Sequence, residues 1–244
     1  MFDINSTSLE KIKNFYDQNG FVIVTNAFSE KECDDIKLKA DSYAEKPSYS
    51  VVLNLHRKSD FFLSVISNEK VVKIAKYIHQ NDVDAVADQY LYKKPSSTYG
   101  KQAWTFHQDN SYPRAPSGNY FIVHLAVDKS EKENGGLIFL PGSHKEDILD
   151  FENNISWREK LDKDGIAKPG QTIKDKSVLE KYNHKNMTFP KGSVCFMHGN
   201  LIHASYPNSS SDRDRNQYSM CYMVRGIENY NKGKNSPKIR TQLY

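Results

Sequence analysis

The chain has 244 residues, a length that a single all-β domain reaches routinely and that two smaller domains would also fill. Its 34 Lys+Arg and 30 Asp+Glu residues give a net charge of +4, and 38% of the residues are hydrophobic. These proportions are those of a globular chain with a sizeable core, so they exclude an intrinsically disordered protein and a polybasic nucleic-acid-binding tail.

Helices are expected in the first 80 residues. Ser8 is placed to cap a helix that ends at Gly20, and its apolar face comprises Leu9, Ile12, Phe15 and Tyr16. A short buried strand follows at 21–24. The capping box from Ser29 to Glu32 begins a second helix that we expect to reach about Tyr43. Apolar residues at helical spacing predict another helix over 68–78.

From about residue 85 the pattern changes to short β-type runs separated by Gly, Pro, Asn and Asp. Aromatic residues make up 12% of the chain, which also favours strands. The expected strands are 85–92, 120–127, 137–140, 187–189, 193–197 and 218–224. We therefore predict a mainly β fold, a sandwich or barrel with flanking α-helices.

Two segments are expected to lie outside this β-rich region. Residues 145–185 are polar and weakly periodic, and we interpret them as a variable insertion or lid with some helix. The Lys- and Asn-rich stretch 229–240 is expected to be a solvated end.

The three cysteines indicate the compartment. Cys33, Cys195 and Cys221 are odd in number and far apart, and they form no Cys-x-x-Cys pair. This pattern predicts a reducing, cytoplasmic environment. The N-terminus shows no basic region followed by an apolar run, and no stretch approaches the ~18 apolar residues of a membrane span, so we expect no membrane segment.

The segment from Trp104 to Asp109 contains a His-x-Asp pair, His107 and Asp109. Strand side chains alternate, so both residues would lie on the same side of an extended strand. Alone, the pair is equally consistent with a surface turn. His203, in a second turn-rich segment, completes two imidazoles and one carboxylate, the ligand set of non-haem Fe(II) oxygenases. A zinc hydrolase accepts the same ligands, so both metals stay open here.

A cation follows the last histidine. Arg213 and Arg215 come ten and twelve residues after His203, and Arg215 opens an alternating run over 218–223. An arginine on the inner face of a strand can bind a carboxylate through two hydrogen bonds. A surface charge within Asp212-Arg213-Asp214-Arg215 is the alternative, and it fits Arg213 better than Arg215.

The order of four motifs resembles the phytanoyl-CoA dioxygenase family. These motifs are His107-x-Asp109, the run Asn134-Gly135-Gly136 to Ser143-His144, the segment 192–205, and an arginine before a final strand. The resemblance extends from about residue 20 to about residue 225. It implies a double-stranded β-helix (a cupin-like jelly roll) and an enzyme that uses Fe(II), 2-oxoglutarate and O2.

The resemblance also implies roles for individual residues. His107, Asp109 and His203 match the iron ligands, and Arg215 matches the arginine that binds the distal carboxylate of 2-oxoglutarate. The spacing from His203 is one residue longer than expected, which leaves Arg213 as an alternative. Further co-substrate positions are Lys94, Gln89, Ser205 and His124. His124 stands where many relatives have tryptophan, and a buried structural histidine is the alternative to a co-substrate contact there.

Since His107 and His203 must meet at one metal, we predict one domain over 1–244. Residues 1–80 would form a helical buttress, 85–225 the jelly-roll core and 145–185 the insertion. The expected reaction is hydroxylation of an unactivated C–H bond, with desaturation or cyclisation as other outcomes and succinate and CO2 as products.

The expected partner is a polar, anionic small molecule. The residues near the iron motif that we expect to bind it are Arg114, Lys101 and Asn110. A non-catalytic jelly-roll binding module and a zinc-dependent hydrolase are the alternatives. A nucleic-acid substrate is disfavoured because a net charge of +4 with no basic stripe neutralises few phosphates. No feature of the sequence specifies an oligomeric state.

Overall fold

The structure is a computed structural model that describes residues 1–44, 51–97, 99–153, 170–228 and 240–243. Within these ranges an eight-stranded sheet has the order β1-β2-β11-β6-β13-β4-β14, with β3 paired to β4. Its strands are β1 (Phe2–Asp3), β2 (Phe21–Thr25), β3 (Val51–Leu53), β4 (Val83–Leu91), β6 (Tyr120–Ala126), β11 (Val194–His198), β13 (Gln217–Val224) and β14 (Thr241–Gln242).

A smaller sheet has the order β10-β7-β12-β5. Its strands are β5 (Trp104–His107), β7 (Leu137–Phe139), β10 (Lys185–Asn186) and β12 (His203–Ser205). Apolar side chains from both sheets, among them Ile23, Ile122 and Phe139, share one buried cluster. Two facing sheets around one core form a jelly roll, so the predicted fold class is confirmed.

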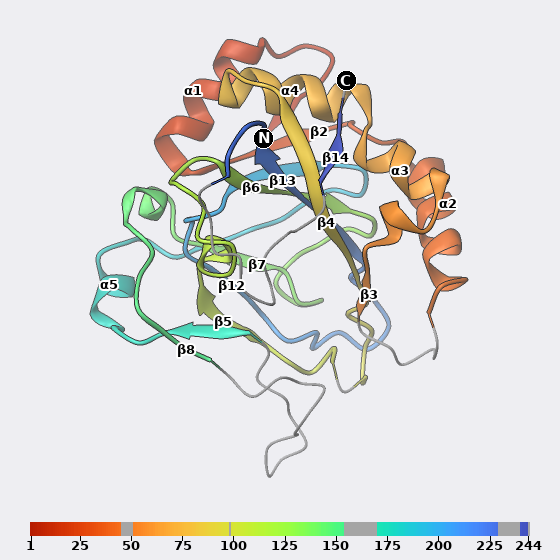
Figure 1. Ribbon diagram of the computed structural model, residues 1–244. Coiled ribbons are helices and arrows are strands. Elements are labelled where there is room, and N and C mark those ends of the chain that lie inside the picture. Colours follow the sequence, from red (N-terminus) through yellow and green to blue (C-terminus); the bar gives the residue numbers. More distant parts are fainter. Residues whose placement is uncertain (45–50, 98, 154–169, 229–239, 244) are drawn as a thin grey trace.

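Four helices cover the outer face of the larger sheet (Figure 1). They are α1 (Leu9–Asn19), α2 (Glu30–Asp41), α3 (Asp60–Ile66) and α4 (Glu69–His79). Ser8 accepts a hydrogen bond from Lys11 N, Gly20 ends α1 at φ 79°, and the Ser29–Glu32 capping box is present. The first two helices therefore begin and end as their capping signals predict, except that α2 stops at Asp41.

The sheet boundaries differ from the sequence expectation. Within 1–80, β2 matches the strand expected at 21–24, but β1 and β3 were not expected, and β14 joins the larger sheet from beyond residue 225. The strand expected at 187–189 is replaced by β10, while Phe189 only forms an isolated bridge with Ser130. Pro190 follows Phe189 and has no N–H to donate, so the pairing ends there.

The described part of the insertion contains the four-residue helix α5 (Ser177–Glu180) and a small sheet of β8 (Phe151–Asn153) and β9 (Gln171–Ile173). The expected helix is thus present but short. Residues 154–169 lie outside the described residues, as does most of the expected solvated end, 229–240. Three short 3-10 helices complete the elements: η1 (Leu55–Arg57), η2 (Asp109–Ser111) and η3 (Ser143–Lys145).

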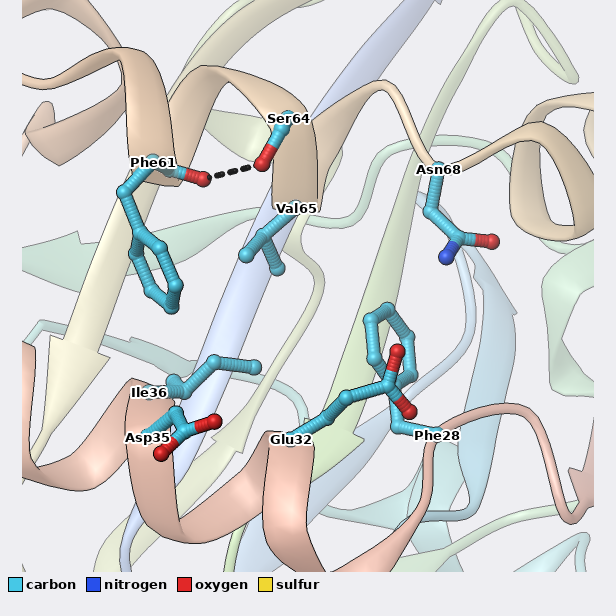
Figure 2. A pocket seen from close by; sticks show the side chains of 8 residues that line it. All are labelled: Phe28, Glu32, Asp35, Ile36, Phe61, Ser64, Val65 and Asn68. Carbon is cyan, nitrogen blue, oxygen red and sulfur yellow. Dashed lines mark hydrogen bonds between the residues drawn. The ribbon is translucent and has the colours of Figure 1, made fainter.

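A cavity of about 150 Å³ lies between α2 and α3 (Figure 2). Its walls include Phe28, Ile36, Phe61 and Val65, and none of its lining residues belongs to the expected metal or co-substrate set. The functional site must therefore be sought elsewhere. None of the helices in the described ranges combines the length and apolar character needed to cross a bilayer.

Candidate functional site: a His-Asp-His metal centre

Two histidines and one aspartate meet where β5 and β12 lie side by side. His203 is the direct register partner of His107 in this antiparallel pair. Gln108 is extended (φ −120°, ψ 125°), so Asp109 at the start of η2 returns to the side of His107. The Nε2 atoms of His107 and His203 lie 3.4 and 3.7 Å from the two Asp109 carboxylate oxygens. One ligand atom from each residue lies within 4.8 Å of the others, a spacing at which the three side chains could hold one metal ion.

Backbone carbonyls fix the proton on each imidazole. His107 Nδ1 lies 2.7 Å from Thr105 O, and His203 Nδ1 lies 3.0 Å from Leu201 O. Because a carbonyl oxygen only accepts, Nδ1 must be the donor in both rings. The Nε2 lone pairs are thereby left facing Asp109, ready for a metal ion.

The charges of the three ligands suit a divalent cation. Burial, followed by the neighbouring His107, lowers the pKa of His203 to about 4. Burial raises the pKa of Asp109, but His203 and His107 outweigh it and hold this pKa below its usual value. Two imidazoles and one carboxylate are the facial ligand set of non-haem Fe(II) oxygenases.

Arg215 and Arg213 lie in different environments. Arg215 is buried, with 3% exposure, and it donates from Nε to Gly135 O (3.1 Å) and from Nη1 to Gln217 Oε1 (2.8 Å). Burial lowers its pKa to about 10. Arg213 is exposed and ion-paired with Glu131. Arg215, and not Arg213, therefore lies in the interior, although its spacing from His203 is one residue longer than the family resemblance led us to expect.

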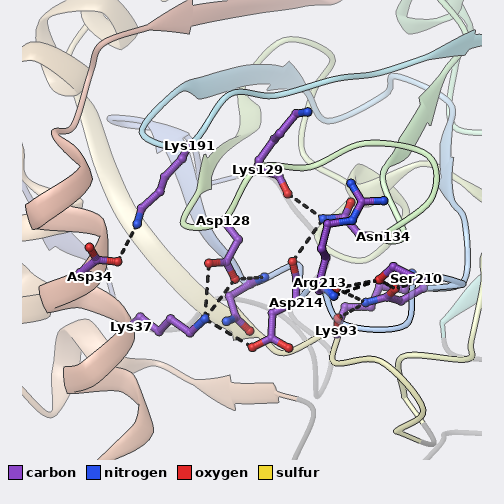
Figure 3. Close-up of polar contacts among 12 residues, drawn as sticks. Asp34, Lys37, Lys93, Asp128, Lys129, Asn134, Lys191, Ser210, Arg213 and Asp214 are labelled. Carbon is purple, nitrogen blue, oxygen red and sulfur yellow. Dashed lines mark hydrogen bonds and ion pairs between the residues drawn. The ribbon is translucent and has the colours of Figure 1, made fainter.

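Figure 3 shows Lys37 paired with Asp128 and with Asp214, the residue that precedes Arg215 in the chain. Lys37 of α2 lies 3.3 Å from Asp214 and 3.4 Å from Asp128. Asp128 in turn accepts a hydrogen bond from Asn216 N at 3.0 Å. Both neighbours of Arg215 in the chain are therefore connected to α2, Asp214 directly and Asn216 through Asp128.

His124, Ser219 and Gln89 form one row across the inner face of the larger sheet. Ser219 of β13 is the register partner of both His124 on β6 and Gln89 on β4. His124 is buried, and its Nδ1 lies 2.8 Å from Ser219 Oγ and 2.7 Å from Gln217 Nε2. Sequence reasoning missed Gln217 and Ser219, although they share the inward phase of the alternating run that begins after Arg215.

The buried lysine at the end of β4 is Lys93 and not Lys94. Lys93 Nζ donates to Ser205 Oγ at 3.0 Å, and burial, followed by the charge of Arg215, holds the pKa of Lys93 well below its usual value. Lys94 lies 5.5 Å from the ring of Tyr92, outside this arrangement. Strand alternation explains this difference between the two lysines, because residue 93 continues the inward phase of Gln89 whereas residue 94 shares the phase of Tyr92.

The expected substrate residues have different surroundings. Asn110 is buried, and its side-chain amide forms hydrogen bonds with Ala115 and Asn200. It therefore stabilises a loop and offers no group to a ligand. Arg114 is exposed, with its guanidinium 5.6 Å from the ring of Phe151. Lys101 is exposed.

Two tyrosines that the sequence did not single out lie near the carboxylate of Asp109. Burial, followed by the charge of Asp109, raises the pKa of Tyr112, and burial, followed by Cys221 and then Asp109, raises the pKa of Tyr120. The insertion reaches this region through β9, where Thr172 Oγ1 lies 2.7 Å from Thr105 Oγ1 of β5. The described part of the insertion thus borders the metal centre.

Comparison with known proteins agrees with this geometry. The family model described as phytanoyl-CoA dioxygenase (PhyH) matches residues 16–216. The chain belongs to the phytanoyl-CoA dioxygenase family. This membership confirms the expected enzyme class, an Fe(II)- and 2-oxoglutarate-dependent dioxygenase, and the expected iron and 2-oxoglutarate cofactors.

Individual relatives are distant but span most of the chain. A phytanoyl-CoA dioxygenase domain-containing protein 1 homolog from Caenorhabditis briggsae is 22% identical, covering 92% of this chain and 94% of that protein. An ectoine dioxygenase from Stutzerimonas stutzeri is 23% identical, covering 88% and 76%. The solved structure of the epimerase SnoN, in complex with Fe3+, alpha ketoglutarate and nogalamycin RO, has a TM-score of 0.73 at 18% identity and covers 96% and 94% of the two chains.

Proposed function

We propose that this dioxygenase hydroxylates an unactivated C–H bond of a polar small molecule and releases succinate and CO2. The proposal rests chiefly on Asp109, whose carboxylate lies between the Nε2 atoms of both histidines. With the carboxylate retained as a ligand, no position is freed for a halide. Desaturation and cyclisation are the other outcomes that the same metal centre allows.

Each residue of the site has a role in this proposal. His107, Asp109 and His203 would hold Fe(II), which together with 2-oxoglutarate supplies oxidising chemistry that side chains lack. Arg215 would pair with the distal carboxylate of 2-oxoglutarate, supported by its burial and its fixed direction. Lys93, held by Ser205, is the lysine that would contribute to this pocket in place of Lys94.

The proposed substrate is a small anion. Arg114 carries an exposed cation on the loop that follows the metal ligand Asp109, next to Phe151 of the insertion. Lys101 adds a second exposed cation before β5. Arg114 is the better candidate for binding this anion, because the insertion that it contacts also contacts β5 through Thr172.

The alternatives explain fewer of these observations. A binding module without chemistry gives no reason for two Nε2 lone pairs and a carboxylate to converge in a buried space. A zinc-dependent hydrolase leaves the buried guanidinium of Arg215 without a role. The free, buried cysteines Cys33, Cys195 and Cys221 support the proposal that the enzyme works in a reducing compartment such as the cytoplasm.

Substrate-dependent succinate formation tests the proposal. The full-length protein with Fe(II), ascorbate and 2-oxoglutarate would be screened against a panel of small carboxylic and phosphorylated metabolites. Asp109→Ala should lose more than about 100-fold in activity, because even residues behind the ligands contribute 10–100-fold at metal sites. Asp150→Ala, at an exposed carboxylate, is the matched control.

The mass of the product identifies the reaction. A gain of one oxygen atom indicates hydroxylation, and a loss of two hydrogens indicates desaturation or ring closure. Full activity in Asp109→Ala would overturn the assignment of the metal centre.

A further inference from the structure

The side chain of Gln108 lies between the metal centre and the insertion. In the chain this residue stands between two of the proposed metal ligands, and it is buried, with 2% exposure. Its Nε2 donates to Asn200 O at 3.0 Å and to Asp147 O at 3.1 Å, and its Oε1 accepts from Leu149 N at 2.9 Å. None of the roles proposed above uses this amide.

The three partners fix the orientation of the amide. A backbone N–H only donates and a carbonyl only accepts, so the oxygen of Gln108 must face Leu149 and its NH2 group must face Asp147 and Asn200. The opposite orientation would place the oxygen against two carbonyls and the NH2 group against an N–H. A buried amide that is bonded on both sides in this way is held rigidly.

Asn200 belongs to the turn that precedes β12, the strand of His203. This turn accepts a hydrogen bond from His203 Nδ1 at 3.0 Å. Asn110 holds the turn from the other side of Asp109. Its backbone N donates to Gly199 O and its Nδ2 donates to Asn200 Oδ1, both at 2.8 Å. The residues before and after Asp109 are therefore both bonded to the turn that leads to His203.

The other two partners of Gln108, Asp147 and Leu149, belong to the start of the insertion. The turn reaches the same segment, because Asn200 Nδ2 donates to Glu146 O at 3.2 Å. Gln108 thus joins three parts of the chain: the segment that follows β5, the turn before β12 and the insertion.

We propose that Gln108 is a positioning residue that couples the placement of the insertion to the placement of Asp109 at the metal. The proposal rests on the function proposed above, since it takes Asp109 as a metal ligand. Loss of the amide would leave three buried backbone groups without a partner and release the residue next to Asp109, so metal binding should weaken. Because coupling is reciprocal, metal binding should also stabilise the start of the insertion.

Titration of the full-length protein with Co(II), followed by its visible absorption, tests the effect on the metal. Gln108→Met keeps the length of the side chain but removes the amide, so we expect the Kd for Co(II) to rise about tenfold, as for residues behind metal ligands. Gln108→Asn keeps an amide that is one methylene too short to reach all three partners, and it should also raise the Kd. An unchanged Kd in either folded variant would overturn the proposal.

Asn134 offers a matched control. Its buried amide makes the same three kinds of hydrogen bond, because Oδ1 accepts from Glu131 N at 2.8 Å and Nδ2 donates to Lys129 O at 2.7 Å and to Asp214 O at 3.1 Å (Figure 3). Asn134→Leu should lower the urea midpoint as Gln108→Met does, yet leave the Kd for Co(II) unchanged. An equal rise of the Kd in both variants would reduce the role of Gln108 to general stability and overturn the proposal.

Hydrogen exchange measures the reverse effect. In the wild type, Co(II) should slow the exchange of peptides that cover residues 146–153, which include the N–H of Leu149. This protection should be lost in Gln108→Met and kept in Asn134→Leu. Absence of protection in the wild type, or equal protection in Gln108→Met, would overturn the coupling to the insertion.

The two proposals fail in different ways. If Asp109→Ala binds Co(II) as tightly as the wild type, Asp109 is not a ligand and the proposed function is wrong. If Asp109→Ala loses Co(II) while folded Gln108→Met binds it normally, only the role of Gln108 is wrong.

Discussion

His203 lies directly opposite His107 in the register of β12 and β5, and this pairing brings the two imidazoles together beside Asp109. Strand side chains alternate between the two faces of a sheet, so a shift of one residue would turn one imidazole away from the other. The His107–Asp109 pair recognised in the sequence therefore gains its third partner, His203, only when β5 and β12 pair in this register.

Arg215 and Arg213 should differ sharply when each is replaced by glutamine. Arg215→Gln is expected to raise the Kd for 2-oxoglutarate about 10- to 100-fold, because it removes charge-assisted hydrogen bonds from a buried position. Arg213→Gln breaks only an exposed ion pair with Glu131, and such pairs contribute at most about 1 kcal/mol to stability. Calorimetric titration of both metal-loaded variants measures the difference. A larger effect at Arg213 would contradict the placement of Arg215.

Lys37 should influence binding from outside the site. Lys37→Met removes the cation between Asp128 and Asp214, so we expect the Kd for 2-oxoglutarate to rise a few-fold and the free energy of unfolding to fall by about 1 kcal/mol. Lys191→Met is the matched control, because Lys191 pairs with Asp34 on the same helix α2 but not with a neighbour of Arg215 (Figure 3). Equal changes in Kd for both variants would show that the ion pairs do not fix Arg215.

The free energy of unfolding should decrease in acid because buried histidines such as His79 resist protonation in the folded protein. Burial, followed by the charge of His198, lowers the pKa of His79 to about 3, whereas an unfolded histidine titrates near 6.5. Below about pH 6.5 the unfolded chain binds a proton that folded His79 does not bind until about pH 3. Each such group therefore removes about 1 kcal/mol of stability per pH unit across that window.

His79→Phe tests this linkage. The substitution keeps a ring to stack on Phe121, whose centroid lies 4.0 Å from that of His79, but it removes the titrating group. Urea unfolding of metal-free protein at pH 7.5, 6.0 and 5.0 should show a smaller loss of stability in the variant than in the wild type. The same loss in both proteins would mean that His79 does not contribute.

The turn before β11 should tolerate no side chain at Gly192. This residue has φ +78°, and an added Cβ would lie 2.1 Å from Phe28 O, so Gly192→Ala is expected to cost about 3 kcal/mol or more. Gly226 has a similar φ of +84° with nothing within 4 Å of an added Cβ. Gly226→Ala should therefore show only the backbone cost of about 1–2 kcal/mol. Chemical denaturation of both variants compares them, and equal losses would contradict the clash.

Local sequence signals determined where the first two helices of this protein begin and end. The N-cap residue Ser8, the capping box of Ser29 and Glu32, and Gly20 at φ 79° act within a few residues, so the first two helices could be predicted from the sequence. The ordered motifs also predicted the family, the jelly roll and a metal centre that contains His107 and Asp109. Helix α3 was missed because it has only seven residues and no side-chain cap.

Only the tertiary structure decided which side chains share the interior. Lys93 and not Lys94 faces Ser205, Arg215 and not Arg213 is buried, and Gln217 connects the guanidinium to His124. These choices depend on strand phase and on register between segments far apart in the chain. A local pattern gives the alternation of side chains, but packing of the two sheets decides which phase points inward, because only the folded core distinguishes the two faces of a strand.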